Sequence, residues 1–218
     1  MLELLPRFLP AFMSGLAVNF QIAICALLGG LLLGAPLAVA RFRNGLASTP
    51  AAWLVALLRT VPTFVVMFFL VNVVPATVSL GNWQFGMTPW LAVVLSLTLY
   101  AAAYVSDHAV EAMRQLRSGS PVAAMLFVMG LVRAFFVMVL SSGFGAAVGV
   151  VEATTITLRA IETLPKVSDR LLLIGLVIVI FTVCFQLIYQ VINRWRGRLN
   201  QRFHRPVQAA RLEGVEQP

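Results

Sequence analysis

Five long apolar stretches constrain the fold of this chain more than any other feature, and they span residues 15–40, 53–75, 89–106, 122–151 and 171–193. A helix needs about 20 mostly apolar residues to cross the hydrocarbon core of a bilayer. Backbone polar groups in lipid must be hydrogen-bonded within the protein, and these stretches lack the alternation of barrel strands. The sequence therefore predicts an all-α, polytopic membrane protein with about five transmembrane helices.

Composition excludes an ordinary soluble domain, because 60% of the residues are hydrophobic and only 11% are charged. Soluble domains have about 25% charged residues. The small residues Ala38 to Ala40 resemble a signal-peptide cleavage site. However, the stretch 15–40 is longer than a signal core and further stretches follow, so we expect a transmembrane helix there.

The fourth stretch is ambiguous, because it carries Arg133 and is interrupted by Ser-Ser-Gly-Phe-Gly at 141–145. The pattern fits two interpretations: one kinked span, or a membrane-buried segment that is followed by a separate span. Proline removes a helix hydrogen bond, so Pro36 and Pro62 each predict a kink or a helix start.

Arginines follow the first, third and fifth stretches, whereas residues 76–88 carry no charge and residues 152–170 balance basic against acidic side chains. The positive-inside rule then predicts an external N-terminus and a cytoplasmic C-terminus. This explains the net charge of +8 without nucleic acid as a partner. Residues 1–200 are expected to form the transmembrane domain, and residues 201–218 a basic, disordered cytoplasmic tail in contact with membrane lipid.

No constellation of catalytic residues is recognisable. The chain has two histidines, His108 and His204, and eight carboxylates spread over its connections. Cys25 and Cys184 have no Cys or His at ligand spacing. A phosphate-binding G-x-x-x-x-G-K-[ST] loop is missing, so ATP hydrolysis would need a separate chain. The sequence predicts no enzyme, no cofactor and no metal site.

Polar side chains within or beside apolar stretches are candidates for a solute path, because they cost free energy unless they face protein or water. Asn72, Gln186 and Asp107 are the candidates here, although amides also hydrogen-bond between helices. Glu111 is followed by Arg114 and Arg117. Two interpretations stay open for this acidic and basic segment: a solvated helix end with a Glu111–Arg114 pair, or a docking surface for a cytoplasmic partner.

Four segments in register resemble the polar amino acid permeases of ABC importers. They are Leu9 to Arg41, Leu58-Arg59-Thr60-Val61-Pro62 running on to Val74-Pro75, Ala103-Tyr104-Val105-Ser106-Asp107, and Val148 to Thr154. In that family an Arg-Gly-Thr-Pro signature opens the second span, and Arg59 and Pro62 match it. Asp107 stands where the family usually has glutamate.

The cytoplasmic coupling loop of that family departs from the pattern here. The family carries Glu-Ala-Ala followed three residues later by glycine, and this loop docks into the ATPase. The present chain keeps Gly119, Ala123 and Ala124, but it has Val122 in place of the glutamate, and Gly130 comes two positions late. By this resemblance the ATPase-coupling residues are Glu111, Arg114, Arg117, Gly119, Ala123, Ala124 and Gly130.

The resemblance implies a type I-like importer permease in a bacterial inner membrane that translocates amino acids or similar small polar solutes. Its expected partners are an ATP-binding subunit, an extracytoplasmic solute-binding protein and a second permease, in a heterodimer rather than a homodimer. Two alternatives stay open. One is a secondary carrier or channel, and the other is a non-transporting paralogue that serves as a partner subunit.

Overall fold

The computed structural model describes residues 4–213 apart from 44, 76, 81–82 and 120–122, and it describes side chains outside 78–85 and 195–213. The chain divides into two compact units, Met1–Arg170 and Leu171–Pro218, and each is described by itself. The elements in chain order are α1 (Leu5–Phe42), α2 (Ser48–Thr60), α3 (Thr63–Val73), β1 (Val78–Leu80), β2 (Trp83–Phe85), α4 (Pro89–Arg117), α5 (Ala123–Ser141), the 3-10 helix η1 (Ser142–Val148), α6 (Ala153–Glu162) and α7 (Val167–Glu213).

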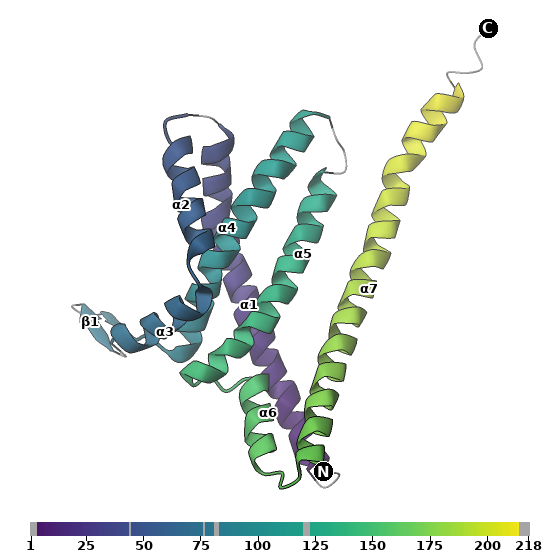
Figure 1. Cartoon of the computed structure of the whole chain (residues 1–218). Coiled ribbons are helices and arrows are strands. Elements are labelled where there is room, and N and C mark those ends of the chain that lie inside the picture. The colour runs from purple at the N-terminus through teal and green to yellow at the C-terminus, as the bar shows by residue number, and fades with distance from the viewer. Residues whose placement is uncertain (1–3, 44, 76, 81–82, 120–122, 214–218) are drawn as a thin grey trace. The chain divides into compact units, whose positions relative to one another are not determined.

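Helix α1 is the longest element of the first unit, and its most extensive contacts are with α4. It has 38 residues, which corresponds to about 57 Å at about 1.5 Å per residue. The hydrocarbon core of a bilayer is only about 30 Å thick, so α1 extends beyond it. One end of α1 packs against α6 and the other against α2 (Figure 1).

Small residues allow α1 and α4 to approach closely. A Cβ atom on Gly30 would lie 2.3 Å from Cβ of Ala101, and one on Gly34 would lie 2.5 Å from the carbonyl oxygen of Ala102. Both distances are too short for a real side chain, so glycine is required at these two positions. The Gly30-x-x-x-Gly34 spacing therefore serves close helix packing.

The second apolar stretch is broken rather than continuous. Helices α2 and α3 meet at an angle of 86° (Figure 1). Val61 and Pro62 are both extended, and Pro62 is the N-cap of α3. Proline disfavours the helical conformation in the residue before it, which ends α2 at this point. The predicted role of Pro62 as a kink or helix start is confirmed.

The fourth stretch forms one continuous candidate span over Ala123–Val148, in which α5 passes directly into η1. This supports the first of the two interpretations, a single span, over a buried segment followed by a separate span. The 3-10 helix begins within the Ser-Ser-Gly-Phe-Gly interruption and ends at Gly149, which has a φ of 93° that favours glycine. Helix α6 then occupies part of the connection 152–170.

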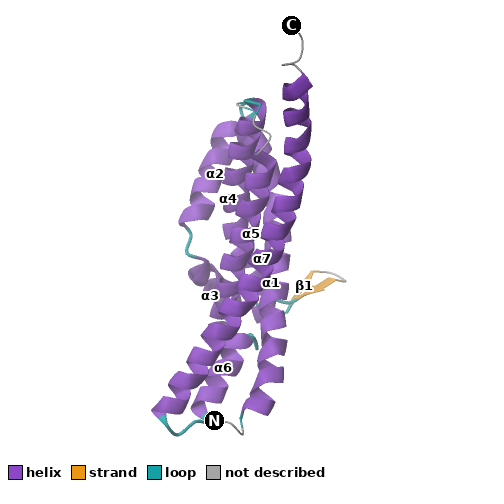
Figure 2. Cartoon of the chain, turned by 90° about the vertical axis from the view of Figure 1, so that its right-hand side faces the viewer, coloured by secondary structure: helices purple, strands orange, loops and turns teal. Residues whose placement is uncertain are grey.

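Among the residues that the structure describes, four helices are long and apolar enough to cross a membrane, and the count is five if the bent α2–α3 pair is one span. The predicted all-helical, multi-pass membrane fold is confirmed. Among the described residues, the short antiparallel pair of β1 and β2 is the exception, within a connection that carried no strand prediction (Figure 2). Helix α7 continues to Glu213, so the backbone is helical over 201–213, a segment whose composition predicts a disordered tail.

Candidate functional site at the arginine-rich end of the first unit

Asp107 joins three helices in an ionic cluster. One of its carboxylate oxygens accepts a hydrogen bond of 2.8 Å from Nη1 of Arg41, in the last turn of α1. The other oxygen accepts one from Nη2 of Arg59, in the last turn of α2. Asp107 itself lies on α4. Removing the carboxylate would therefore release contacts among α1, α2 and α4 together.

Burial differs between the two arginines of this cluster. The side chain of Arg41 is 21% exposed and also donates to the hydroxyl of Ser106 at 3.0 Å, whereas the side chain of Arg59 is 61% exposed. A half-buried guanidinium loses more hydration than an exposed one, so it depends more on its protein partners. The Arg41–Asp107 pair is thus the stronger of the two contacts.

The structure unites two predicted residues that came from different arguments. Arg59 was predicted from the family signature and Asp107 from its position beside an apolar stretch. Arg41 and Ser106 were not predicted as site residues, although Arg41 ends the first stretch and could have been recognised as a candidate partner for a carboxylate at the same predicted membrane depth.

The three predicted solute-path residues have separate surroundings. Asn72 is exposed and donates to the carbonyl oxygen of Phe68 within α3 at 2.7 Å, which is a local helix bond. Asp107 is engaged by the two arginines. Gln186 is exposed on α7 and belongs to the second unit. Within the described residues no hydrogen bond links any two of them, and their role in a path stays a prediction.

The acidic and basic segment of α4 is a helix end without the pair that the first interpretation requires. Glu111 accepts a hydrogen bond of 2.8 Å from Gln115 rather than pairing with Arg114. Arg114 and Arg117 are exposed. Gly119 follows with a φ of 84°, a left-handed conformation that ends helices and favours glycine.

The remaining residues of the predicted ATPase-coupling set lie on α5. Ala124 is exposed, whereas Ala123 has no exposed surface. Gly130 lies opposite the His108 ring on α4, where an added Cβ would be 3.0 Å from Cδ2. A partner cannot reach Ala123 in this conformation, and Gly130 provides room for a helix contact within the chain. The docking role of the segment as a whole stays a prediction.

Helix α4 ends at Arg117 and α5 begins at Ala123, so five residues of sequence, 118–122, separate the two helices. The apolar residues that follow are part of α5 and of a candidate span. Val122, which stands where the resembling family has glutamate, thus belongs to a short interval between two helices.

A second polar cluster lies against the N-terminal half of α1 and was not predicted. Glu152 is fully buried and caps α6, because it accepts hydrogen bonds from the backbone N–H groups of Thr154 and Thr155 at 2.8 and 2.9 Å. Asn19 donates to Glu152 at 2.9 Å and to the Ser142 hydroxyl at 2.8 Å. Asn19 also accepts from the backbone N–H of residue 153 at 3.1 Å.

This cluster is a structural clamp between α1, η1 and α6, since each of its polar atoms has a partner. One sequence signal was available, because Asn19 is an amide inside the first apolar stretch. Glu152 gave none, because glutamate is not among the residues preferred at a helix N-cap. Elsewhere in the described part of the chain, His, Cys, Asp and Glu side chains form no group of three suited to a metal ion.

Comparisons with known proteins identify the fold. No family model matches the sequence, and no curated protein matches it. A chain in the crystal structure of an amino acid ABC transporter with histidines superposes with a TM-score of 0.68 at 16% identity, over 89% of this chain and 96% of that one. A chain of the inward-facing MetNI methionine ABC transporter gives a TM-score of 0.56 at 14% identity, over 84% and 97%. The present chain therefore shares, over most of its length, the helical membrane fold of these ABC transporter chains.

Proposed function

We propose that this chain is the membrane-spanning permease subunit of an ABC importer that moves amino acids or similar small polar solutes across a bacterial cytoplasmic membrane. The observation that carries this proposal is the likeness in fold, which covers 89% of this chain and 96% of a chain from an amino acid ABC transporter. The pairing of Arg59 with Asp107 supports it, because both residues belong to segments that resemble the family. Both similar transporters are described as carrying amino acids or methionine, which supports the solute class.

The proposed orientation has the N-terminus outside and the C-terminus in the cytoplasm. Its support is that Arg41, Arg114 and Arg117 line one cavity, so the basic ends of α1 and α4 lie together. Reporter fusions at Leu80 and Arg205 test this orientation, and we expect opposite sides, with Arg205 inside. Reporters that give the same side would refute it.

The proposed assembly contains an ATP-binding subunit, an extracytoplasmic solute-binding protein and a second permease. The exposed residues around the α4–α5 connection, Glu111, Arg114, Arg117, Gly119 and Ala124, are the proposed contacts with the ATPase. Closure of two ATPase subunits would then shift the permease pair between outward-open and inward-open states. The two permeases form a heterodimer in this proposal, because a second permease with an intact loop compensates for Val122.

A second candidate function is that of a partner subunit that assembles with an intact permease without coupling ATP hydrolysis itself. The observation that favours it is the connection of residues 118–122, which is short and leads directly into α5. This candidate also places the chain in an ABC assembly, but it predicts that the second permease alone transmits the motion of the ATPase.

The test is co-expression of the chain with candidate ATPase, binding-protein and permease subunits from the same genome, followed by affinity purification and solute uptake into proteoliposomes. We expect the ATPase to co-purify with wild type, and Ala124→Trp to reduce its recovery. Ala47→Trp is the matched control, because Ala47 is also exposed but lies in the connection between α1 and α2 and outside the proposed ATPase contact.

Three results separate the alternatives. ATP-dependent uptake that Ala124→Trp impairs supports the importer. An ATPase that is retained only through the second permease, with no effect of Ala124→Trp on uptake, supports the partner subunit. Uptake by this chain alone, driven by an ion gradient, would refute both and leave a secondary carrier.

A further inference from the structure

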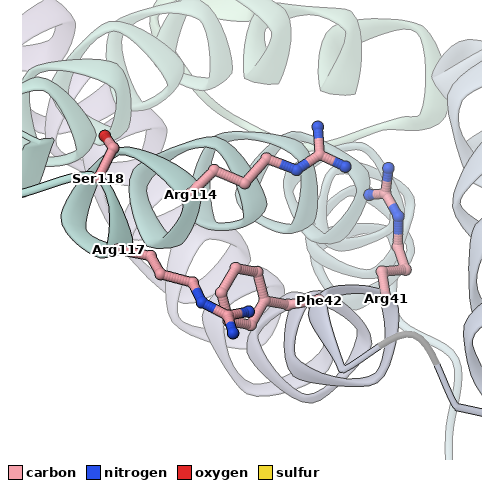
Figure 3. A pocket seen from close by; sticks show the side chains of 5 residues that line it. All are labelled: Arg41, Phe42, Arg114, Arg117 and Ser118. Carbon is pink, nitrogen blue, oxygen red and sulfur yellow. The ribbon is translucent and has the colours of Figure 1, made fainter.

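A cavity of about 340 Å³ opens between the ends of α1 and α4 in the first unit. Its lining consists of Arg41, Phe42, Arg114, Arg117 and Ser118 (Figure 3). Figure 3 shows the guanidinium group of Arg114 turned toward that of Arg41, while the side chain of Arg117 extends beside the ring of Phe42. Three arginines from two helices thus converge on one small space.

The positive charge in this cavity is mostly uncompensated. Arg41 pairs with Asp107. Arg114 and Arg117 have no ion pair or side-chain hydrogen bond within the described residues, and Glu111, the carboxylate one turn away, accepts from Gln115. Three guanidinium groups around one space repel each other unless an anion lies between them. The arrangement therefore favours an anionic ligand.

The cavity lies where the apolar stretch of α1 ends. Arg41 directly follows the apolar stretch 15–40, so its backbone marks the point where the first span leaves the hydrocarbon. Side chains on a helix lean toward its N-terminus, which directs Arg114 and Arg117 back from the end of α4 toward the bilayer. At this depth the groups that carry negative charge in a bilayer are lipid headgroups.

We propose that this cavity binds the phosphate of an anionic phospholipid from the cytoplasmic leaflet. Guanidinium groups form paired hydrogen bonds with phosphate oxygens, and a phosphodiester offers them a single negative charge at the centre of the cavity. The Phe42 ring supplies an apolar wall for the glycerol and the first acyl carbons. This inference rests on the orientation given under Proposed function.

The test measures thermal unfolding of the full chain in phosphatidylcholine nanodiscs that contain increasing fractions of phosphatidylglycerol. We expect phosphatidylglycerol to raise the unfolding temperature of wild type. The variant Arg114→Gln/Arg117→Gln should need about tenfold more phosphatidylglycerol for the same rise, because it loses both uncompensated guanidinium groups. Arg114→Lys/Arg117→Lys keeps the charge but not the planar forks, and it should give an intermediate response.

The matched control is Arg43→Gln/Arg194→Gln. It removes the same charge from exposed arginines that follow the first and fifth apolar stretches and do not line the cavity. Its response should stay within about threefold of wild type, because the cavity is intact and only diffuse attraction to the anionic surface is reduced. Equal responses of this control and the Arg114→Gln/Arg117→Gln variant would show surface attraction alone and overturn the proposal.

Two further arms identify the ligand. Inorganic phosphate in phosphatidylcholine nanodiscs should have little effect, and stabilisation equal to that by phosphatidylglycerol would replace the lipid with a free anion. An unchanged lipid response of Arg114→Gln/Arg117→Gln, with the ATPase lost, would leave these two arginines to the proposed ATPase contact alone and overturn the lipid site. The nanodisc measurement uses the permease alone, so its failure leaves the proposed transport function intact, and failed assembly or uptake leaves the lipid measurement valid.

Discussion

Replacing Asp107 by asparagine should destabilise the helix bundle more than the same change elsewhere on α4. Asparagine keeps the size of the side chain and one carbonyl oxygen, but it removes the charge. Arg41, which is 21% exposed, would lose its charged partner and keep only neutral acceptors, the Ser106 hydroxyl and the amide oxygen of the new side chain. Arg59 would lose its only ion pair within the described residues.

The structure gives the magnitude of this effect. A hydrogen bond to a charged group contributes about 1.5–3 kcal/mol when it is shielded from water, which applies to the Arg41–Asp107 contact. Arg59 is 61% exposed, and exposed ion pairs contribute about 0–1 kcal/mol. The total is about 1.5–4 kcal/mol. Since about 1 kcal/mol shifts the unfolding temperature of a chain of this size by about 2–4 °C, we expect a decrease of between about 3 and 16 °C.

The measurement is thermal unfolding of the purified chain in detergent micelles. The quantity monitored is the fraction of the protein that remains monodisperse after heating. Glu111→Gln is the matched control, because Glu111 lies one turn further along α4, is exposed and bonds only to Gln115 among the described residues. It should change the unfolding temperature by less than about 2 °C, since exposed interactions contribute little.

A double-mutant cycle makes the assignment specific. If Arg41 and Asp107 act as a pair, Arg41→Gln should cost much less in the Asp107→Asn background than in wild type. Additive effects of the two substitutions, or an Asp107→Asn effect no larger than that of Glu111→Gln, would show that the cluster does not hold the helices together.

Two further substitutions test the packing of α1. Gly30→Ala should lower stability by about 1–3 kcal/mol, because its Cβ would lie 2.3 Å from that of Ala101. The control Gly175→Ala, whose Cβ would have no atom within 4 Å, should be neutral or stabilising by up to about 1 kcal/mol. Equal shifts in the unfolding temperature of the two variants would contradict the close approach of α1 and α4. Glu152→Gln should lower stability by about 1–3 kcal/mol, because an amide N–H₂ would face hydrogen-bond donors in a fully buried position, whereas Glu162→Gln at the exposed end of α6 should have little effect. If Glu152→Gln and Glu162→Gln had the same unfolding temperature, the buried cap would not be required.

The number and type of the membrane elements could be predicted from the sequence. Mean hydropathy over about 20 residues is a local property of the chain, and lipid permits only helices with internally satisfied backbone groups. Pro62 could be predicted as a helix boundary for a similar reason, since proline acts on its own turn of the chain. The resemblance added Arg59, which the structure places in an ionic cluster.

The extents of the helices were less predictable. The start of α1 at Leu5 and the helix α6 lie outside or between the apolar stretches, where amphipathic packing rather than hydropathy sets the structure. The choice between the two interpretations of the fourth stretch also needed coordinates, because Ser and Gly are compatible with a 3-10 turn, a kink or a break.

The sequence by itself determined that the chain folds as a bundle of apolar helices, because each stretch must satisfy its own backbone hydrogen bonds in lipid. Only the tertiary structure decided which polar side chains meet. Asp107 lies 66 positions from Arg41, and Glu152 lies 133 positions from Asn19. Whether Arg41 and Asp107 pair depends on the register at which Gly30 and Gly34 let α1 pack against α4, and that register is a property of two surfaces in contact rather than of either segment alone.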